Sequence, residues 1–298
     1  IGNGKVISVL PDWKNRIWFA TKDGVVGWTD RRGTIVSRDV GEVISNSFAV
    51  GQGAGVFIVT DAAMYRFEAG AGGSGEPEIV WRKAYPNTGT KKPGQTSEGS
   101  GTTPTLLTKR YVAIADNGDP MGIVVMDRRR KPERKRIVCR IEVLGRGTGS
   151  TDQSLTGIGR SLMVENNYGY SGVTSVENGA STTPGLERVD IKPPQRLGRN
   201  PARNCVRRWR SEEIAPSVVP KLSLGAGLVY TYTKPELESG TDAWYFTALD
   251  WRDGDTVFKQ LAGYGLGYNN NYAPVSIGPD GTAYVGVLGG LVRIADRS

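Results

Sequence analysis

Apolar positions along the chain fall into short runs of about five residues, separated by turns rich in Gly, Asp and Asn. The clearest example spans residues 7–39 and reads as ISVLPDW, RIWFATK, VVGWTD and TIVSRD. The turns between these runs contain Asn15, Gly24 and Gly33. No segment repeats its apolar positions at the 3.6-residue spacing of an amphipathic helix. The pattern therefore predicts an all-β fold of short strands.

The four-run cycle recurs at intervals of roughly 40 to 65 residues, which is the period of propeller blades. We expect one six-bladed β-propeller of four-stranded antiparallel blades over residues 1–298. The expected blades lie at approximately 5–40, 45–85, 101–144, 152–211, 216–262 and 270–296. A seventh unit would have to lie within residues 172–216, and we favour six.

The sixth unit contains three runs, YAPVSIGPD, GTAYVGVLG and GLVRIAD, and lacks a fourth strand. Propellers often obtain such a strand from the opposite terminus, but residues 1–4 are too short to supply it. Either an upstream segment supplies the strand, or the last blade stays open beside Ile1. The sequence begins at Ile1 without Met, which is consistent with removal of a leader, although no signal peptide is visible.

The net charge of +8 is concentrated in two segments. One is residues 128–136, RRRKPERKR, and the other contains Arg196, Arg199, Arg203, Arg207, Arg208 and Arg210. Such clusters can attract phosphate or anionic surfaces, but solvated hairpin tips that prevent edge pairing are the favoured interpretation. Nucleic acid is not expected, because no aromatic stacking motif accompanies the charge. No apolar run is long enough to span a membrane.

Histidine is absent and there are two cysteines, Cys139 and Cys205. These counts exclude His-based zinc chemistry and any Ser–His or Cys–His nucleophile pair. Both cysteines lie late in consecutive repeat units, so a disulfide between adjacent blades is favoured over two separate buried thiols. A disulfide predicts an extracellular or periplasmic protein.

The strand RIWF followed by KDGVVGWTDRRG resembles the repeats of gluconolactonase-like and strictosidine-synthase-like six-bladed propellers. The closing segment GPDGTAYVGVLGGLVRIAD resembles the blades of PQQ-binding-like propellers. These resemblances imply the fold and no particular activity, because propeller repeats occur in enzymes, binders and scaffolds. PQQ quinoproteins have eight blades and a vicinal disulfide, whereas this chain has no adjacent Cys pair, so neither PQQ nor haem is expected. Gluconolactonase-like enzymes hold calcium with Glu, Asn and Asp, but no matching motif is present.

An acid followed by an amide recurs at one repeat position in adjacent blades, as Asp116-Asn117 and Glu165-Asn166. In a propeller, the loops between second and third strands open on the same face as the loops between blades, where ligands usually bind. We therefore expect Asp116, Glu165 and Asp152 to be catalytic. The further candidates for substrate binding are Asn117, Asn166, Asn167, Glu98, Thr102, Thr103, Gln153, Asn271 and Tyr168.

Two chemistries fit these candidates, and a turn-forming role competes with both, because Asp and Asn are common in turns. Calcium held by Asp116, Glu165 and Asn166 would polarise a carbonyl or a water. Metal-free acid–base catalysis would instead depend on carboxylates whose pKa is raised by burial.

We therefore expect an exported enzyme that performs hydrolysis or related chemistry on a small molecule at the channel mouth. The alternative is a non-catalytic binding or scaffold propeller, with an anionic partner. The sequence does not predict an oligomeric state.

Overall fold

The computed structural model describes residues 4–53 and 55–296, which form six antiparallel sheets. Five sheets contain four strands and the last contains three, with sequential strands paired side by side. This arrangement confirms the predicted all-β, six-bladed propeller. Residues 172–216, where a seventh unit was considered, instead contribute two strands and short 3-10 helices to the fourth blade.

The strands are as follows. The first blade contains β1 (Val6–Pro11), β2 (Ile17–Thr21), β3 (Val25–Thr29) and β4 (Ile35–Asp39). The second contains β5 (Ala49–Val50), β6 (Val56–Val59), β7 (Ala63–Gly70) and β8 (Gly75–Ala84). The third contains β9 (Thr105–Leu107), β10 (Tyr111–Ala115), β11 (Gly122–Asp127) and β12 (Ile137–Glu142). The fourth contains β13 (Thr156–Ile158), β14 (Ser161–Glu165), β15 (Leu186–Ile191) and β16 (Cys205–Ser211).

The fifth blade contains β17 (Lys221–Ser223), β18 (Leu228–Thr233), β19 (Ala243–Asp250) and β20 (Thr256–Tyr264). The sixth contains β21 (Val275–Ile277), β22 (Ala283–Val287) and β23 (Gly290–Ile294). The 3-10 helices are η1 (Ala71–Gly73), η2 (Val173–Val176), η3 (Pro194–Arg196), η4 (Pro201–Arg203) and η5 (Leu266–Tyr268). No helix in the described ranges is long and apolar enough to cross a bilayer.

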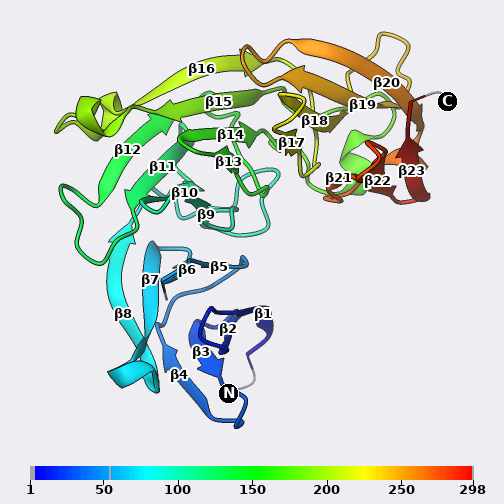
Figure 1. The fold of residues 1–298 in the computed structure, drawn as a ribbon. Coiled ribbons are helices and arrows are strands. Elements are labelled where there is room, and N and C mark those ends of the chain that lie inside the picture. The colour runs from blue at the N-terminus through cyan, green and yellow to red at the C-terminus, as the bar shows by residue number, and fades with distance from the viewer. Residues whose placement is uncertain (1–3, 54, 297–298) are drawn as a thin grey trace.

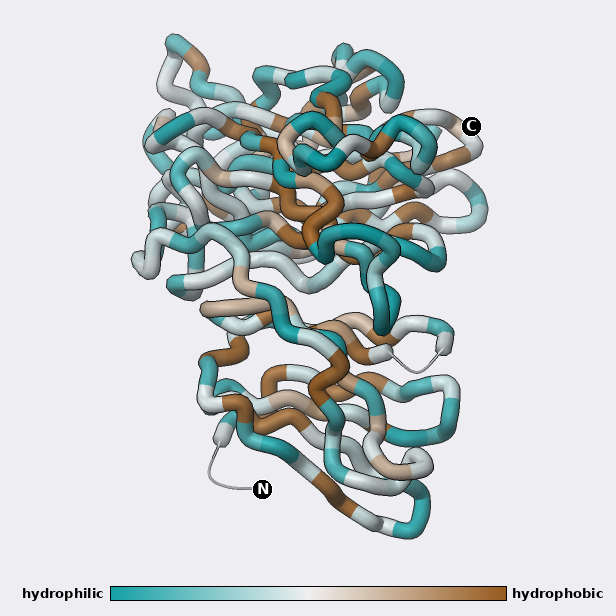
Figure 2. The backbone as a smooth tube through the Cα atoms, turned by 90° about the vertical axis from the view of Figure 1, so that its left-hand side faces the viewer, coloured by the Kyte–Doolittle hydropathy of each residue, from teal (hydrophilic) through white to brown (hydrophobic). Residues whose placement is uncertain are grey.

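Strand alternation packs each blade against both neighbours, because successive side chains point to opposite faces of a sheet. In β10, Val112 and Ile114 pack toward the second blade, while Ala113 and Ala115 pack toward the fourth. This two-sided burial explains why β10 is apolar along its whole length. Figure 2 shows the consequence along the backbone, with hydrophobic stretches within the stacked strands and hydrophilic stretches in the loops.

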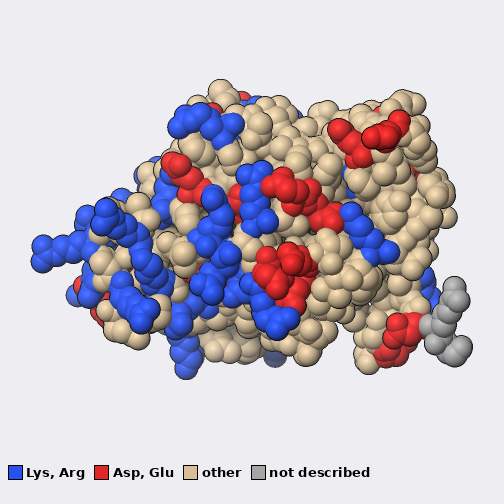
Figure 3. Space-filling view, turned by 90° about the horizontal axis from the view of Figure 1, so that it is seen from above, with Lys and Arg blue, Asp and Glu red and all other residues tan. Residues whose placement is uncertain are grey.

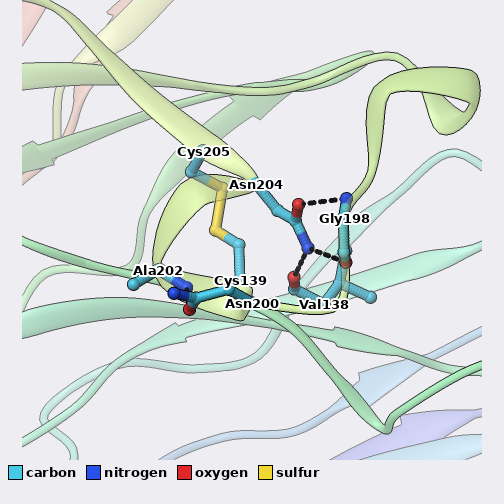
Figure 4. The surroundings of a disulfide bond; sticks show 7 residues. All are labelled: Val138, Cys139, Gly198, Asn200, Ala202, Asn204 and Cys205. Atoms are coloured by element: carbon cyan, nitrogen blue, oxygen red, sulfur yellow. Dashed lines mark hydrogen bonds between the residues drawn. A yellow bond between two sulfur atoms is a disulfide. The ribbon is translucent and has the colours of Figure 1, made fainter.

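The blades follow one another around an arc, with the first strand of each blade on its inner side and the fourth strands of the first five blades outside (Figure 1). Cys139 of β12 and Cys205 of β16 form a disulfide that joins the outer strands of the third and fourth blades, with Cα atoms 5.8 Å apart. Beside it, the buried Asn204 side chain donates to Val138 O, so the disulfide and a polar contact fasten the same two strands (Figure 4). The pairing chosen from the sequence is confirmed.

Antiparallel connectivity divides the loops between two faces. Turns between first and second strands, and between third and fourth strands, lie at one end of each blade. Turns between second and third strands lie at the other end, together with the connections between blades. The acid–amide loops therefore share the second face, whereas residues 128–136 and 192–204 lie on the first. Figure 3 shows Lys and Arg gathered on the side where Figure 1 places the β11–β12 and β15–β16 loops.

Candidate functional site

Asp116 lies directly after β10 and is held by local contacts on all sides. Its Oδ2 is 2.6 Å from Nε of Arg140 on β12. Its Oδ1 accepts the backbone N–H groups of Gly118 and Gly122 at 2.9 and 2.7 Å. Burial raises the pKa of Asp116, while the Arg140 guanidinium and these N–H groups oppose that rise. The geometry therefore gives Asp116 a role in fixing the loop after β10, and we omit it from the catalytic machinery.

The amides of the acid–amide loops are also committed to the loops. Asn166 Oδ1 accepts from the backbone N–H groups of Ser150 and Tyr168, and its Nδ2 donates to Thr148 O and Pro184 O. Asn117 Nδ2 lies 2.9 Å from each of three acceptors in residues 87–98. Asn166 is thus fully used in anchoring the blade connections, whereas the buried Oδ1 of Asn117 has no hydrogen-bond partner among the described residues.

The predicted calcium ligands do not fit a cation well. Asp116 faces a guanidinium, and the oxygen of Asn166 already accepts two N–H groups, so neither offers the free lone pairs that calcium requires. Within residues 4–53 and 55–296, no three or more acidic or cysteine side chains gather in a way that could hold a metal. We therefore derive no chemistry through calcium.

The remaining predicted residues fall into two groups. Glu98 and Asn271 are exposed, and Tyr168 is half-buried. Thr102, Thr103 and Gln153 link neighbouring loops: Thr102 Oγ1 accepts from Ala115 N, the Thr103 N–H donates to Ser154 Oγ, and Gln153 Nε2 donates to Ser217 O. These contacts join successive blade connections into a hydrogen-bonded inner rim.

Two predicted acids differ from Asp116 because part of each carboxyl group has no partner. Asp152 precedes β13, and its buried Oδ1 has no hydrogen-bond partner in the described part of the chain. Glu165 ends β14; its Oε1 accepts from Asn167 Nδ2 at 2.9 Å, and its buried Oε2 is unpartnered there. Buried polar atoms are usually paired, so two free carboxyl oxygens mark a place for water or a ligand.

Burial sets the proton affinity of both acids. Loss of solvent raises the pKa of Asp152 from 3.8 to about 6, although nearby Thr96 and the charge of Lys91 oppose the change. Loss of solvent raises the pKa of the fully enclosed Glu165 well above its usual value, with a smaller opposing effect from Asn167. With a pKa of about 6, Asp152 is mostly ionised at neutral pH, while burial shifts the equilibrium of Glu165 towards its protonated form.

Asn167 connects the two acids and orients them. Its Oδ1 accepts from the backbone N–H of Asp152 at 2.9 Å and from Thr151 Oγ1, while its Nδ2 donates to Glu165 and to Pro216 O. Every hydrogen-bonding group of the amide is used. Asn167 thus acts as a positioning residue for both acids.

Tyr272 completes the group from the loop before β21. Its phenol lies near enough to Asp152, Tyr170 and Glu165 for their charges to raise its pKa, in addition to burial. Its ring meets Tyr170 edge-on, with centroids 5.3 Å apart. Asn271 and Tyr272 both have positive φ, 35° and 68°, which is unusual for residues other than glycine and is common at functional sites. We call Asp152, Glu165, Asn167, Tyr170 and Tyr272 the Asp152 cluster.

Gly101 supports the cluster from the preceding blade connection. A Cβ atom there would lie 2.4 Å from Asp152 Oδ1 and 2.1 Å from Thr151 O. Only glycine permits this approach. The position carries no chemical group, so sequence analysis overlooked it; its sole signal was glycine beside Thr102.

The fold defines the protein as a β-propeller, and comparisons place it among diverse members of that architecture. It is structurally similar to BamB from Moraxella catarrhalis, with a TM-score of 0.55 and 13% identity over 97% of this chain and 84% of the other. It is equally similar to a candidate 6-phosphogluconolactonase from Bacteroides fragilis, with a TM-score of 0.55 and 13% identity over 96% and 82% of the two chains. Hsv2 from Kluyveromyces lactis matches at a TM-score of 0.53 and 9% identity, over 96% and 71%.

In sequence, the chain is 26% identical to an uncharacterised protein of Archaeoglobus fulgidus. The match covers 98% of this chain and 61% of that protein, so the chain spans about three fifths of its relative's length. No family model matches. At these identities the structural similarities establish the propeller fold and nothing about the reaction. The same fold occurs in a lactonase candidate and in other proteins, so any function has to be argued from the site residues.

Proposed function

We propose that the protein is an exported enzyme that hydrolyses a small molecule at the Asp152 cluster. The observation that supports this proposal most strongly is the pair of buried, unpartnered carboxyl oxygens of Asp152 and Glu165. Buried acids with raised pKa values and unmet hydrogen-bonding capacity are typical of acid–base sites. The Cys139–Cys205 disulfide favours an oxidising compartment and hence export.

In this proposal, Asp152 is the general base. With a pKa of about 6, it is mostly ionised at neutral pH and still basic enough to accept a proton from water. The water oxygen bonds to the substrate's acyl carbon as Asp152 takes a proton from the water, which gives a tetrahedral oxyanion. When the oxyanion re-forms the carbonyl, the bond between the acyl carbon and the leaving oxygen breaks, and Asp152 gives its proton to that oxygen, which restores the ionised carboxylate.

The other members of the cluster have supporting roles. Neutral Glu165 retains a proton and hydrogen-bonds the substrate or the water. The Tyr272 phenol keeps its proton, because burial and the neighbouring acids raise its pKa, and it donates a hydrogen bond to the developing oxyanion. No histidine is present, and in this proposal the Asp152 carboxyl group performs the proton transfer.

The test is a hydrolysis screen of neutral lactones and small esters with wild type, Asp152→Asn and Asp253→Asn. Removal of a general base lowers rates by about 10²- to 10⁴-fold, so Asp152→Asn should lose most of the activity. Asp253 is an exposed turn residue and serves as the matched control. Asp116→Asn should lose stability through the broken ion pair with Arg140, while the folded fraction keeps its activity. Equal hydrolysis by wild type and Asp152→Asn would contradict the role of Asp152, and no hydrolysis in the screen would contradict the proposed hydrolytic activity.

A second candidate function is a binding propeller for an anionic partner. The observation in its favour is the basic surface formed by the β11–β12 and β15–β16 loops (Figure 3). The strand connectivity places these loops on the face opposite the Asp152 cluster. Polyphosphate binding that weakens steeply with added salt and is unchanged in Asp152→Asn would support this candidate. Salt-insensitive binding would oppose it.

A further inference from the structure

A separate pocket of about 490 Å³ lies on the basic face, between the β5–β6 turn and the start of the β11–β12 loop. Its lining contains glycine backbone, the Phe57 ring and five Lys or Arg side chains, with no carboxylate. Gly51, Gly55, Phe57, Arg66, Lys109 and Arg128 carry the argument, and we call them the Arg128 pocket. It belongs to blades two and three and shares no residue with the Asp152 cluster.

Arg128 is a cation without a counter-ion in this pocket. Within the described ranges, its guanidinium makes no hydrogen bond or ion pair. Burial lowers its pKa, and the nearby charge of Arg66 lowers it further. Removing a guanidinium from water beside another positive charge costs free energy. A bound anion would offset that cost, because its negative charge attracts both guanidinium groups.

The neighbouring arginines differ because each has an acid. Arg129 pairs with Asp127 at 2.5 Å. Arg130 pairs with Glu68 and Glu78. Arg66 pairs with Glu68 and donates from Nη1 to Arg128 O at 2.7 Å. Arg128 thus remains the uncompensated charge among these four, and it lines the pocket.

Arg66 directs a second donor into the same region. The residue is 9% exposed, and its buried Nε has no partner in the part of the chain the structure describes. The guanidinium carbons of Arg66 and Arg128 lie 5.8 and 5.9 Å from the centroid of the Phe57 ring. Both guanidinium groups thus lie within reach of one aromatic ring, and cation–π attraction favours each of them there.

Two glycines make room for these groups. A Cβ on Gly51 would lie 3.1 Å from Arg128 Nη1, and a Cβ on Gly55 would lie 2.9 Å from Arg66 Nε. The Gly51 N–H donates to Gly55 O at 2.8 Å, which keeps both glycines at the base of the turn. The turn is therefore shaped around the guanidinium groups. Exposed Lys109 adds a mobile positive charge at the rim.

We propose that the Arg128 pocket binds a tetrahedral oxyanion of the phosphate or sulfate type, as a free ion or as a monoester. Planar guanidinium groups match the oxygens of such anions, and Arg66 and Arg128 both line this pocket with unfilled donor capacity. The volume exceeds that of one small ion, so it also accommodates the organic part of a phosphate monoester. This inference does not depend on the enzyme proposal, because it concerns other residues on the opposite face.

The test measures calorimetric binding of inorganic phosphate, inorganic sulfate and glycerol phosphate at constant ionic strength set with chloride. Wild type should bind at least one of them saturably. Arg128→Gln should weaken that binding about tenfold or more, because it removes the uncompensated charge. Gly51→Ala should weaken it several-fold without changing any charge, since the added methyl group crowds Arg128.

Two control variants isolate the site. Arg32→Gln removes an exposed arginine from the β3–β4 turn, and Gly225→Ala adds a methyl group where no atom lies within 4 Å; both should bind like wild type. Tighter binding of glycerol phosphate would identify a monoester as the ligand class, and equal binding a free ion. Absence of saturable binding, or equal weakening in Arg128→Gln and Arg32→Gln, would overturn the proposal. Should Arg128→Gln fold poorly, unchanged binding by Gly51→Ala would overturn it.

Discussion

Asp116 is a buried aspartate and Asp152 a half-buried one on the same face of the molecule, and their neighbours give them different roles. The Arg140 guanidinium and two backbone N–H groups compensate the negative charge of the Asp116 carboxylate. Asp152 keeps an unpartnered oxygen and a pKa of about 6. The sequence alone does not separate the two, because Arg140 lies on another strand and reaches Asp116 only in the folded blade. Residue type identifies candidates here, and their partners decide which of them remain reactive.

The raised pKa of Asp152 makes a prediction about stability. The folded protein holds this proton more tightly than the unfolded chain, whose Asp pKa is near 3.8. The stabilising contribution is therefore complete below about pH 4 and is lost as pH rises through about 6. Asp152→Asn cannot ionise, so it should exceed wild type in free energy of unfolding at pH 7.5 and lose that advantage at pH 4. Urea denaturation at both pH values measures this.

The control for this experiment is Asp253→Asn, which alters an exposed turn. It should follow the wild-type dependence on pH throughout. If Asp152→Asn also retains the wild-type dependence, then Asp152 has an ordinary proton affinity and its proposed role as a base fails.

At the scale of elements, the blades were predictable and the assembly of the site was not. Short apolar runs separated by Gly and Asp turns are a local signal, and they correctly predict the strands. The three-run unit at the end of the chain forms a three-stranded sheet, β21 to β23. The Asp152 cluster instead combines the loop before β13, the end of β14 and the loop before β21. Its partners are far apart in sequence, so Tyr272 and Gly101 carried no local signal for their roles.

The disulfide gives a prediction for the outer strands. Cys139 and Cys205 are 66 residues apart and join β12 to β16. Closing a loop of this size constrains the unfolded chain, so the Cys139→Ser/Cys205→Ser double variant should lose about 2–4 kcal/mol of free energy of unfolding. Urea denaturation of oxidised wild type and the double variant measures the difference. Reducing agent should destabilise wild type and leave the double variant unaffected; equal stability of the two proteins would contradict a structural role for the bond.

At the scale of the whole molecule, antiparallel connectivity separates two kinds of chemistry. The blade connections and the turns between second and third strands bring acids, amides and phenols together on one face. The turns at the other end of each blade carry the basic loops and the Arg128 pocket. The sequence indicated both groups of residues, but the interpretation of the basic segments as hairpin tips gave no reason to expect a pocket. That pocket depends on Gly51 and Gly55, which lie in a different blade from Arg128.

The most direct test of the account is a ¹³C NMR titration of the Asp152 side-chain carboxyl, assigned by its loss in Asp152→Asn. If Asp152 is the general base, its titration should have a midpoint near pH 6, because burial raises the pKa of this residue to about 6. A midpoint at or below the ordinary value of 3.8 would contradict the account, because Asp152 would then be a compensated loop residue like Asp116.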